Sequence, residues 1–247
     1  MSMLFAELPV LDRPQAARAA GFSTVETWWP GEAAGAWVDA VSRAGVAVVL
    51  VNADAGDIGA RRVGIPQRRG AARARAPADR RRPAARRARG RPRVNVLVGR
   101  LLPDVPEARQ VAEVVSVLRE AAARAAAAGV TIVLEPINAL DIPGYVLPTA
   151  ADAYALIEAV GSPRVRLLYD AYHAARSGTD PVAEALTFVE IIDHVQYADC
   201  PGRGAPGTGV VDLGRLLDAL FEAGYAGLVG LEYDPRGDTL GSLSALP

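Results

Sequence analysis

Eight short runs rich in Val, Ile and Leu alternate with longer segments rich in Ala, Leu, Glu and Arg, and this alternation limits the chain to few folds. Runs of this kind predict buried parallel strands, and the segments between them predict helices. Several of the predicted helices are followed by a glycine that can end them. The predicted strands are 3–6, 24–29, 46–52, 94–98, 131–135, 165–170, 194–199 and 228–233, and the predicted helices are 13–20, 33–44, 107–128, 150–159, 182–192 and 213–223.

Eight strands alternating with helices in 247 residues predict an α/β fold, a single (β/α)8 TIM barrel domain spanning residues 1–247. A doubly wound sheet is the structural alternative. It is disfavoured because the first predicted strand is followed by Ala6-Glu7-Leu8-Pro9 rather than by a glycine-rich phosphate loop.

The composition favours a soluble, cytoplasmic protein. Hydrophobic residues make up 51% of the chain, which is enough for a sizeable core, and the formal net charge is −1. No apolar run reaches the roughly 18 residues of a membrane-spanning helix, and no basic region precedes the apolar start of the chain. The single cysteine, Cys200, cannot form an internal disulfide, and we expect it to be a small buried residue.

Polar residues lie at the ends of the last four predicted strands. They are Glu135, Asp170, Gln196 and Glu232, spaced by 35, 26 and 36 residues, or about one βα unit each. The carboxyl ends of barrel strands form the active-site face, so the four side chains are expected to point at a common centre. Three carboxylates there would repel one another unless a cation lay among them.

Oxygen donors without thiolates suit a hard divalent cation such as Mg²⁺ or Mn²⁺. The alternative is that each acid caps a helix or pairs with an arginine. Four such residues in consecutive units favour the metal site.

Segments throughout the chain resemble the hydroxypyruvate isomerase family, a branch of the xylose-isomerase-like barrels that includes sugar epimerases and endonuclease IV. The resemblance covers nearly the whole chain apart from about residues 61–92. It is most specific at HVQYADCPGRGAPGTG, where glutamine stands at a position that is histidine in many relatives. The segments are FAELP, GFSTVE, LVNADAGD, PRVNVLVGR, LEPIN, YDAYH, HVQYADCPGRGAPGTG and GLEYDP.

The resemblance implies that Glu135, Asp170, Gln196 and Glu232 hold the metal, and that Glu135 and Glu232 are also the catalytic pair. The implied reaction interconverts hydroxypyruvate and tartronate semialdehyde through an enediolate, which a divalent cation stabilises. One carboxylate removes a proton and a carboxyl on the other side returns it. Isomerisation of 2-oxo-tetronate or epimerisation of a ketose is the alternative within the same superfamily.

Further residues are candidates for binding the substrate. His173 follows Asp170 by three residues and could hydrogen-bond a substrate oxygen or shuttle a proton, and Arg203 offers a forked donor for a substrate carboxylate. Glu7 and Asn52, at the ends of the first and third predicted strands, could line the pocket. Trp28 and Trp29 could form the apolar wall of the pocket, but we favour ordinary packing for both. For His194 we favour a packed or solvent-facing position.

Residues 61–92 form an atypical segment where the third helix should lie. Fourteen of the 27 basic residues, all arginines, fall between Arg61 and Arg93, with Asp79 as the only acid. Large aliphatic residues are absent after Ile65, so the segment cannot present an apolar helix face. We favour two compensating frameshifts in the coding sequence over a genuine basic insert, and we expect the segment to pack poorly.

The arginine tract also defines a rival of another class, a barrel that binds nucleic acid electrostatically. The tract has no aromatic residue for base stacking, so any such binding would be independent of base sequence, and we do not expect nucleic acid as a partner. The expected partner is a small hydroxy-carbonyl acid substrate, and a homodimer is the expected assembly.

Overall fold

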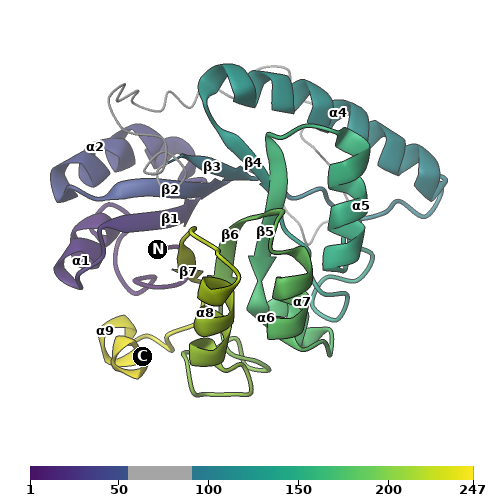
Figure 1. Ribbon diagram of the computed structural model, residues 1–247. Coiled ribbons are helices and arrows are strands. Elements are labelled where there is room, and N and C mark those ends of the chain that lie inside the picture. Colours follow the sequence, from purple (N-terminus) through teal and green to yellow (C-terminus); the bar gives the residue numbers. More distant parts are fainter. Residues whose placement is uncertain (55–90, 247) are drawn as a thin grey trace.

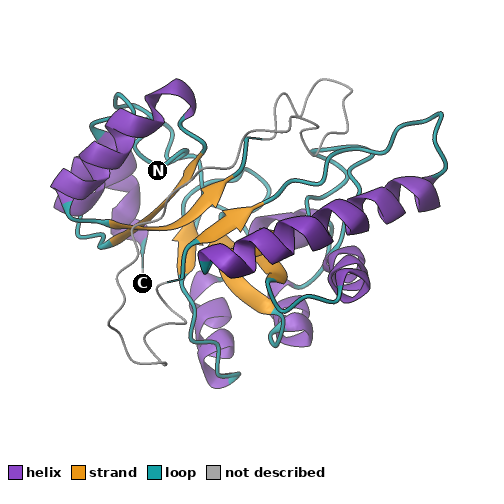
Figure 2. Ribbon diagram, turned by 90° about the horizontal axis from the view of Figure 1, so that it is seen from above, coloured by secondary structure: helices purple, strands orange, loops and turns teal. Residues whose placement is uncertain are grey.

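A computed structural model describes residues 1–54 and 91–246 and shows a nearly closed barrel with helices outside it (Figures 1 and 2). Seven parallel strands follow one another around the sheet in sequence order, each hydrogen-bonded to the next. The TIM-barrel prediction is therefore confirmed. The strands are β1 (Thr24–Trp28), β2 (Ala47–Asn52), β3 (Arg93–Asn95), β4 (Thr131–Leu134), β5 (Val165–Asp170), β6 (Ile192–Tyr197) and β7 (Val229–Leu231).

The helices cover the outside of the sheet, and their glycine stops are as predicted. Gly45, Gly129 and Gly161 take left-handed conformations at the ends of α2, α4 and α5. Across residues 1–54 and 91–246, no helix combines the length and apolar content that crossing a bilayer requires. The helices are α1 (Arg13–Ala19), α2 (Ala34–Ala44), α4 (Glu107–Ala128), α5 (Ala150–Val160), α6 (Ala171–Arg176), α7 (Pro181–Phe188), α8 (Leu213–Glu222) and α9 (Thr239–Ser242), with short 3-10 helices at Gly31–Ala33 and Leu243–Ala245.

The core has two parts, because side chains alternate in direction along a strand. A large cluster joins the helices to the sheet and includes Val114 and Leu118 of α4. A small separate cluster is formed by Leu50, Val133 and Leu168 from three strands, and we place it inside the barrel.

The strand predicted at residues 3–6 is wrong. These residues form turns, and Phe5 has a positive φ of 59°, which a strand does not allow. Ser2 accepts a hydrogen bond from the Trp28 amide of β1, and the Phe5 amide donates to Thr239 beyond β7. The segment therefore contacts the chain on both sides of the seam between β1 and β7 instead of pairing as a strand.

The predictions for residues 61–92 fall almost wholly outside the described residues. The described chain resumes at residue 91, where the Pro92 carbonyl accepts a hydrogen bond from the Thr131 amide at the start of β4.

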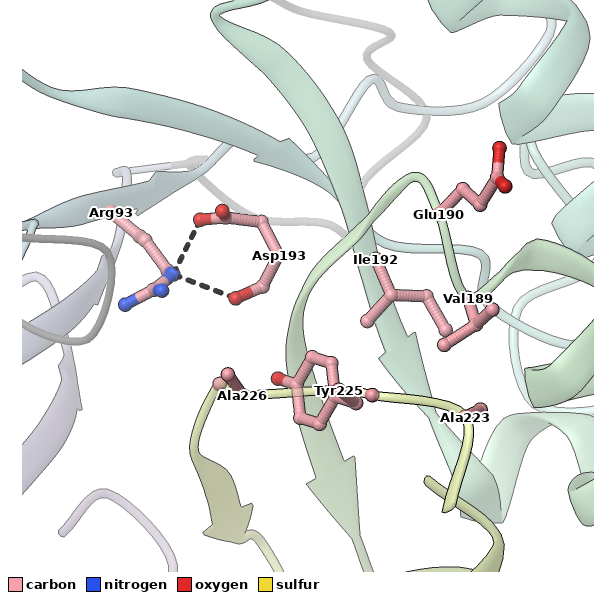
Figure 3. A pocket seen from close by; sticks show the side chains of 10 residues that line it. Arg93, Val189, Glu190, Ile192, Asp193, Ala223, Tyr225 and Ala226 are labelled. Atoms are coloured by element: carbon pink, nitrogen blue, oxygen red, sulfur yellow. Dashed lines mark hydrogen bonds and ion pairs between the residues drawn. The ribbon is translucent and has the colours of Figure 1, made fainter. Parts of the chain in front are cut away.

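Arg93 crosses the barrel at the amino-terminal ends of the strands. It begins β3 with a side chain that is 1% exposed, and its Nε donates to the carboxylate of Asp193 at 2.6 Å and to the Asp193 carbonyl at 3.0 Å. Asp193 lies near the start of β6, three strands away. Figure 3 shows this pair together with Ile192 and Tyr225, which line the same cavity. The volume of the cavity is about 270 Å³. The ion pair therefore closes the end of the barrel opposite the candidate site.

Candidate active site

Four predicted ligand residues lie at the carboxyl ends of consecutive strands. Glu135 and Glu232 directly follow β4 and β7, Asp170 ends β5, and Gln196 is the Cα partner of Asp170 on β6. All four are buried, with 0–8% of each residue exposed. The structure thus brings residues from four consecutive strands to one end of the barrel, as their spacing predicts.

Two basic side chains link the three carboxylates of this cluster. Nε2 of His173 lies 3.6 Å from both Glu135 Oε1 and Asp170 Oδ2. Nη2 of Arg203 lies 2.7 Å from Glu232 Oε2 and 3.5 Å from Asp170 Oδ2. Each side chain therefore faces a shared space at the barrel mouth.

Two buried oxygens in the cluster fit a cation. Asp170 Oδ2 and Gln196 Oε1 have no hydrogen-bond partner among the described residues. Buried polar atoms normally form hydrogen bonds, so a carboxylate oxygen that has only the longer contacts to His173 and Arg203, together with an amide oxygen that has no hydrogen bond, suits a hard divalent cation. The donor set of three carboxylates and one amide fits Mg²⁺ or Mn²⁺.

The electrostatics of the two glutamates also suit a cation site. Burial raises the pKa of Glu135 well above its usual value, and the charges of Glu232 and Asp170 raise it further. Burial likewise raises the pKa of Glu232 to about 7, although Arg203 opposes the shift. A cation would favour the ionised form of both groups.

The ring of His173 is held as a hydrogen-bond donor. The Asp141 amide donates to Asn138 Oδ1 at 2.9 Å, which leaves Asn138 Nδ2 to face His173 Nδ1 at 2.7 Å. Because the Asn138 NH₂ group donates to Nδ1, Nδ1 is the acceptor and the ring proton lies on Nε2. Burial lowers the pKa of His173, so the neutral ring presents an N–H to Glu135 and Asp170 rather than a lone pair to a metal.

Arg203 reaches the cluster from the loop after β6. Its guanidinium lies 5.0 Å from the centroid of the Tyr172 ring, and its backbone is left-handed with φ 50°. The Asp234 amide donates to the Arg203 carbonyl at 2.7 Å. The structure thus places this predicted substrate-binding arginine beside Glu232 and Asp170.

Asp199 holds the loop that carries Arg203. Its carboxylate accepts backbone N–H groups from Cys200 and Val211 at 2.8 Å and from Gly209 at 2.7 Å. A Cβ at Gly209 would overlap the Cys200 carbonyl oxygen, so the loop can close only with glycine there. The buried Cys200 agrees with its predicted packing role.

We expect Asp199→Ala to destabilise the protein by about 1–3 kcal/mol, since the buried N–H groups of Cys200 and Val211 and the partly buried N–H of Gly209 lose their acceptor. The loop should also open, which exposes the bond after Arg203 to trypsin. Chemical denaturation and timed proteolysis measure both effects. Asp218→Ala, at a solvent-accessible acid on α8, is the control. Unchanged cleavage at Arg203 would contradict this role of Asp199.

The two remaining predicted residues, Glu7 and Asn52, take no part in the ion pairs that join the three carboxylates. The exposed Glu7 binds the amide and hydroxyl of Thr239. Asn52 ends β2 opposite Asn95, and its Oδ1 is buried without a hydrogen bond among the described residues. The geometry therefore gives Glu7 a contact to α9, while Asn52 stays a candidate pocket residue.

Two expectations of simple packing need correction. Trp28 is 52% exposed, and its indole Nε1 lies 3.4 Å from Glu232 Oε1, so it borders the site. Trp29 is 44% exposed. His194 is buried, as expected, but its Nε2 pairs with Glu26 Oε2 at 2.7 Å.

Sequence reasoning missed three polar residues around the cluster. Asn95 donates to Glu135 Oε2 at 2.6 Å, Glu26 contacts Gln196, and Asn138 holds His173. Asn95 and Glu26 were not selected because they lie within the predicted strands 94–98 and 24–29, whereas only residues at strand ends were considered. A polar residue within an otherwise apolar strand, as in VNV and TVET, was the available signal.

Fold and site together define a barrel enzyme with its reaction centre at the carboxyl ends of the strands. The family model for the xylose isomerase-like TIM barrel matches residues 14–246, and the chain belongs to this family. A Streptomyces coelicolor protein provisionally named a hydroxypyruvate isomerase is 38% identical, covering 100% of this chain and 94% of the relative.

A second relative and a solved structure are also similar to this chain. The 2-oxo-tetronate isomerase of Cupriavidus necator is 34% identical, with 100% of this chain and 95% of the relative covered. The solved structure of an AP endonuclease, family 2, from Brucella melitensis is similar with a TM-score of 0.82 at 26% identity, over 98% of this chain and 94% of that one.

Proposed function

We propose that this isomerase-family barrel interconverts hydroxypyruvate and tartronate semialdehyde in a divalent-metal-dependent reaction. The observation that carries the proposal is the buried cluster in which Glu135 and Glu232 have raised pKa values and in which Asp170 Oδ2 and Gln196 Oε1 have no hydrogen bond among the described residues. The provisionally named Streptomyces relative supports the choice of substrate.

Glu135, Asp170, Gln196 and Glu232 would hold the cation, which when bound acts as a Lewis acid toward the carbonyl and hydroxyl oxygens of the substrate. Glu135 and Glu232 follow strands β4 and β7, so they can approach a substrate from two sides. One carboxylate takes a proton from C3 of hydroxypyruvate, and the other, as a carboxyl, gives a proton to C2. The hydroxyl proton at C3 is lost as the oxygen at C2 gains one, so atoms balance.

His173 and Arg203 act on the substrate's oxygens. The Nε2–H of His173 can donate to the oxygen that gains charge in the enediolate. Arg203 can exchange its contact with Glu232 for the substrate carboxylate, which matches its forked donors. Trp28 borders the same space and limits access of water.

A 2-oxo-tetronate substrate is the second candidate, because the Cupriavidus relative covers the whole chain at 34% identity. The same glutamate pair would move the proton between adjacent carbons. The two substrates differ in chain length beyond the reacting carbons, so they should be assayed side by side.

The test measures loss of hydroxypyruvate and of 2-oxo-tetronate by the chelated protein before and after adding Mn²⁺ or Mg²⁺. We expect activity only with the cation, and a larger rise in KM than fall in kcat for Arg203→Gln. A neutral ketose should be insensitive to Arg203→Gln if it reacts at all. A metal-independent rate equal to the metal-loaded rate would overturn the proposal.

Mn²⁺ binding is expected to weaken as the pH falls. The raised pKa of Glu232, about 7, means that a proton occupies this group below neutral pH in the cation-free protein. Since the ion requires the carboxylate, the apparent affinity should rise about tenfold between pH 6 and pH 8 from Glu232 alone. Calorimetric titrations in that range measure it, and a pH-independent affinity would contradict the assignment of Glu232 as a ligand.

A further inference from the structure

Strands β1 and β7 are the two edges of the sheet that do not pair (Figure 1). Glu26 lies on β1 beside the seam between them. Its carboxylate lies over Gly230 of β7, where an added Cβ would fall 2.5 Å from Glu26 Oε1 and 2.6 Å from Oε2. Glycine at position 230 therefore leaves room for the Glu26 carboxylate, which any larger residue would displace. Gly230 is also the Cα partner of Gln196 on β6, so the Glu26 carboxylate lies beside the candidate ligand.

Two donors hold this carboxylate. His194 Nε2 lies 2.7 Å from Glu26 Oε2, and Gln196 Nε2 lies 3.1 Å from Glu26 Oε1. The Glu26 side chain is 11% exposed and that of His194 is 1% exposed. Both contacts are therefore shielded from water, where such hydrogen bonds are strong.

These contacts decide which way the Gln196 amide points. An ionised carboxylate only accepts hydrogen bonds, so it requires the NH₂ group of Gln196 and excludes the amide oxygen. The oxygen, Oε1, is then directed away from Glu26, and it is buried with no hydrogen bond among the described residues. A flipped amide would present N–H groups to the cluster, and N–H groups repel a cation.

We propose that Glu26 is a positioning residue that holds the Gln196 amide with its oxygen toward the candidate cation site, and that His194 holds Glu26 in place. The inference rests on the proposed cation site. It assigns roles to Glu26 of β1 and to His194 of β6, and it explains why β7 carries a glycine at position 230.

Glu26→Gln is the primary variant, because it keeps the size of the side chain. The introduced amide can offer either its NH₂ or its oxygen to Gln196, so the Gln196 amide is no longer forced into one orientation. Loss of an outer partner of a ligand typically weakens metal binding, and we expect Mn²⁺ affinity to fall by about 10–100-fold. Isothermal titration calorimetry with Mn²⁺ alone, without substrate, measures the affinity of the chelated proteins.

A matched pair of variants at His194 provides a second test. The amide introduced by His194→Gln can place an N–H near the position of Nε2, whereas the ring introduced by His194→Phe has no donor. We expect His194→Gln to retain Mn²⁺ affinity and His194→Phe to lose it. Asp193→Ala is the control for general damage, because it removes an ion pair at the other end of the barrel and should lower the melting temperature without changing Mn²⁺ affinity.

The outcomes separate the two proposals. If the wild-type protein does not bind Mn²⁺, the proposed cation site fails. If the wild type binds but Glu26→Gln and His194→Phe bind equally well, the positioning role is overturned and the cation site stands. Should Glu26→Gln not fold, equal affinities of His194→Gln and His194→Phe overturn the role on their own.

Discussion

Glu232→Gln is expected to lower kcat on hydroxypyruvate by about 10²–10⁴-fold at saturating Mn²⁺, the range typical of a lost general acid or base. The amide is similar in size to the carboxyl but cannot take or return a proton. Glu135→Gln should have a comparable effect. Steady-state rates of the two variants, measured with enough Mn²⁺ to offset a weaker site, test this expectation.

Solvent deuterium exchange distinguishes the two glutamates. The variant that keeps the proton-abstracting carboxylate should still exchange the C3 proton of hydroxypyruvate without forming product, and the other variant should not. Glu190→Gln, at an exposed acid by the amino-terminal end of the barrel, is the control. Full activity of Glu232→Gln would exclude Glu232 from the catalytic pair.

Asp193→Ala is expected to destabilise the protein by about 3 kcal/mol, because the buried Arg93 guanidinium loses the carboxylate that Nε contacts. Breaking a buried pair from one side costs about 3–5 kcal/mol, and we take the lower end because the backbone carbonyl of residue 193 still accepts from Arg93 Nε. For a chain of this size the melting temperature should fall by about 6–12 °C.

The double variant Arg93→Met with Asp193→Ala gives the matched comparison. Removing both charges avoids burying a cation that has lost its carboxylate, so the double variant should be more stable than Asp193→Ala alone. Urea denaturation of the wild type, Arg93→Met, Asp193→Ala and the double variant measures the coupling free energy between the two side chains. A loss below about 1 kcal/mol in Asp193→Ala would show that the pair does not hold the barrel closed.

Local sequence patterns predicted most of the architecture because their physical causes are local. Alternating apolar runs and glycine stops placed α4 at residues 107–128 and β5 at residues 165–170, where the structure has them. They failed at residues 3–6, where apolar side chains are buried in turns. The short helix α6 was missed because it begins directly after β5, which ends at Asp170. Asp170 caps the helix, since its Oδ1 accepts a hydrogen bond from the Tyr172 amide.

The sequence by itself determined the barrel and the four strand-end side chains, since one βα unit per ligand is a property of spacing along the chain. Only the tertiary structure decided how those side chains are held. Glu26 is 168 residues from His194 and 170 from Gln196, and Arg93 is 100 residues from Asp193. These pairs form because closure of the barrel brings both β1 and β3 within reach of β6. No local pattern of apolar and polar residues predicts which distant side chains will meet there.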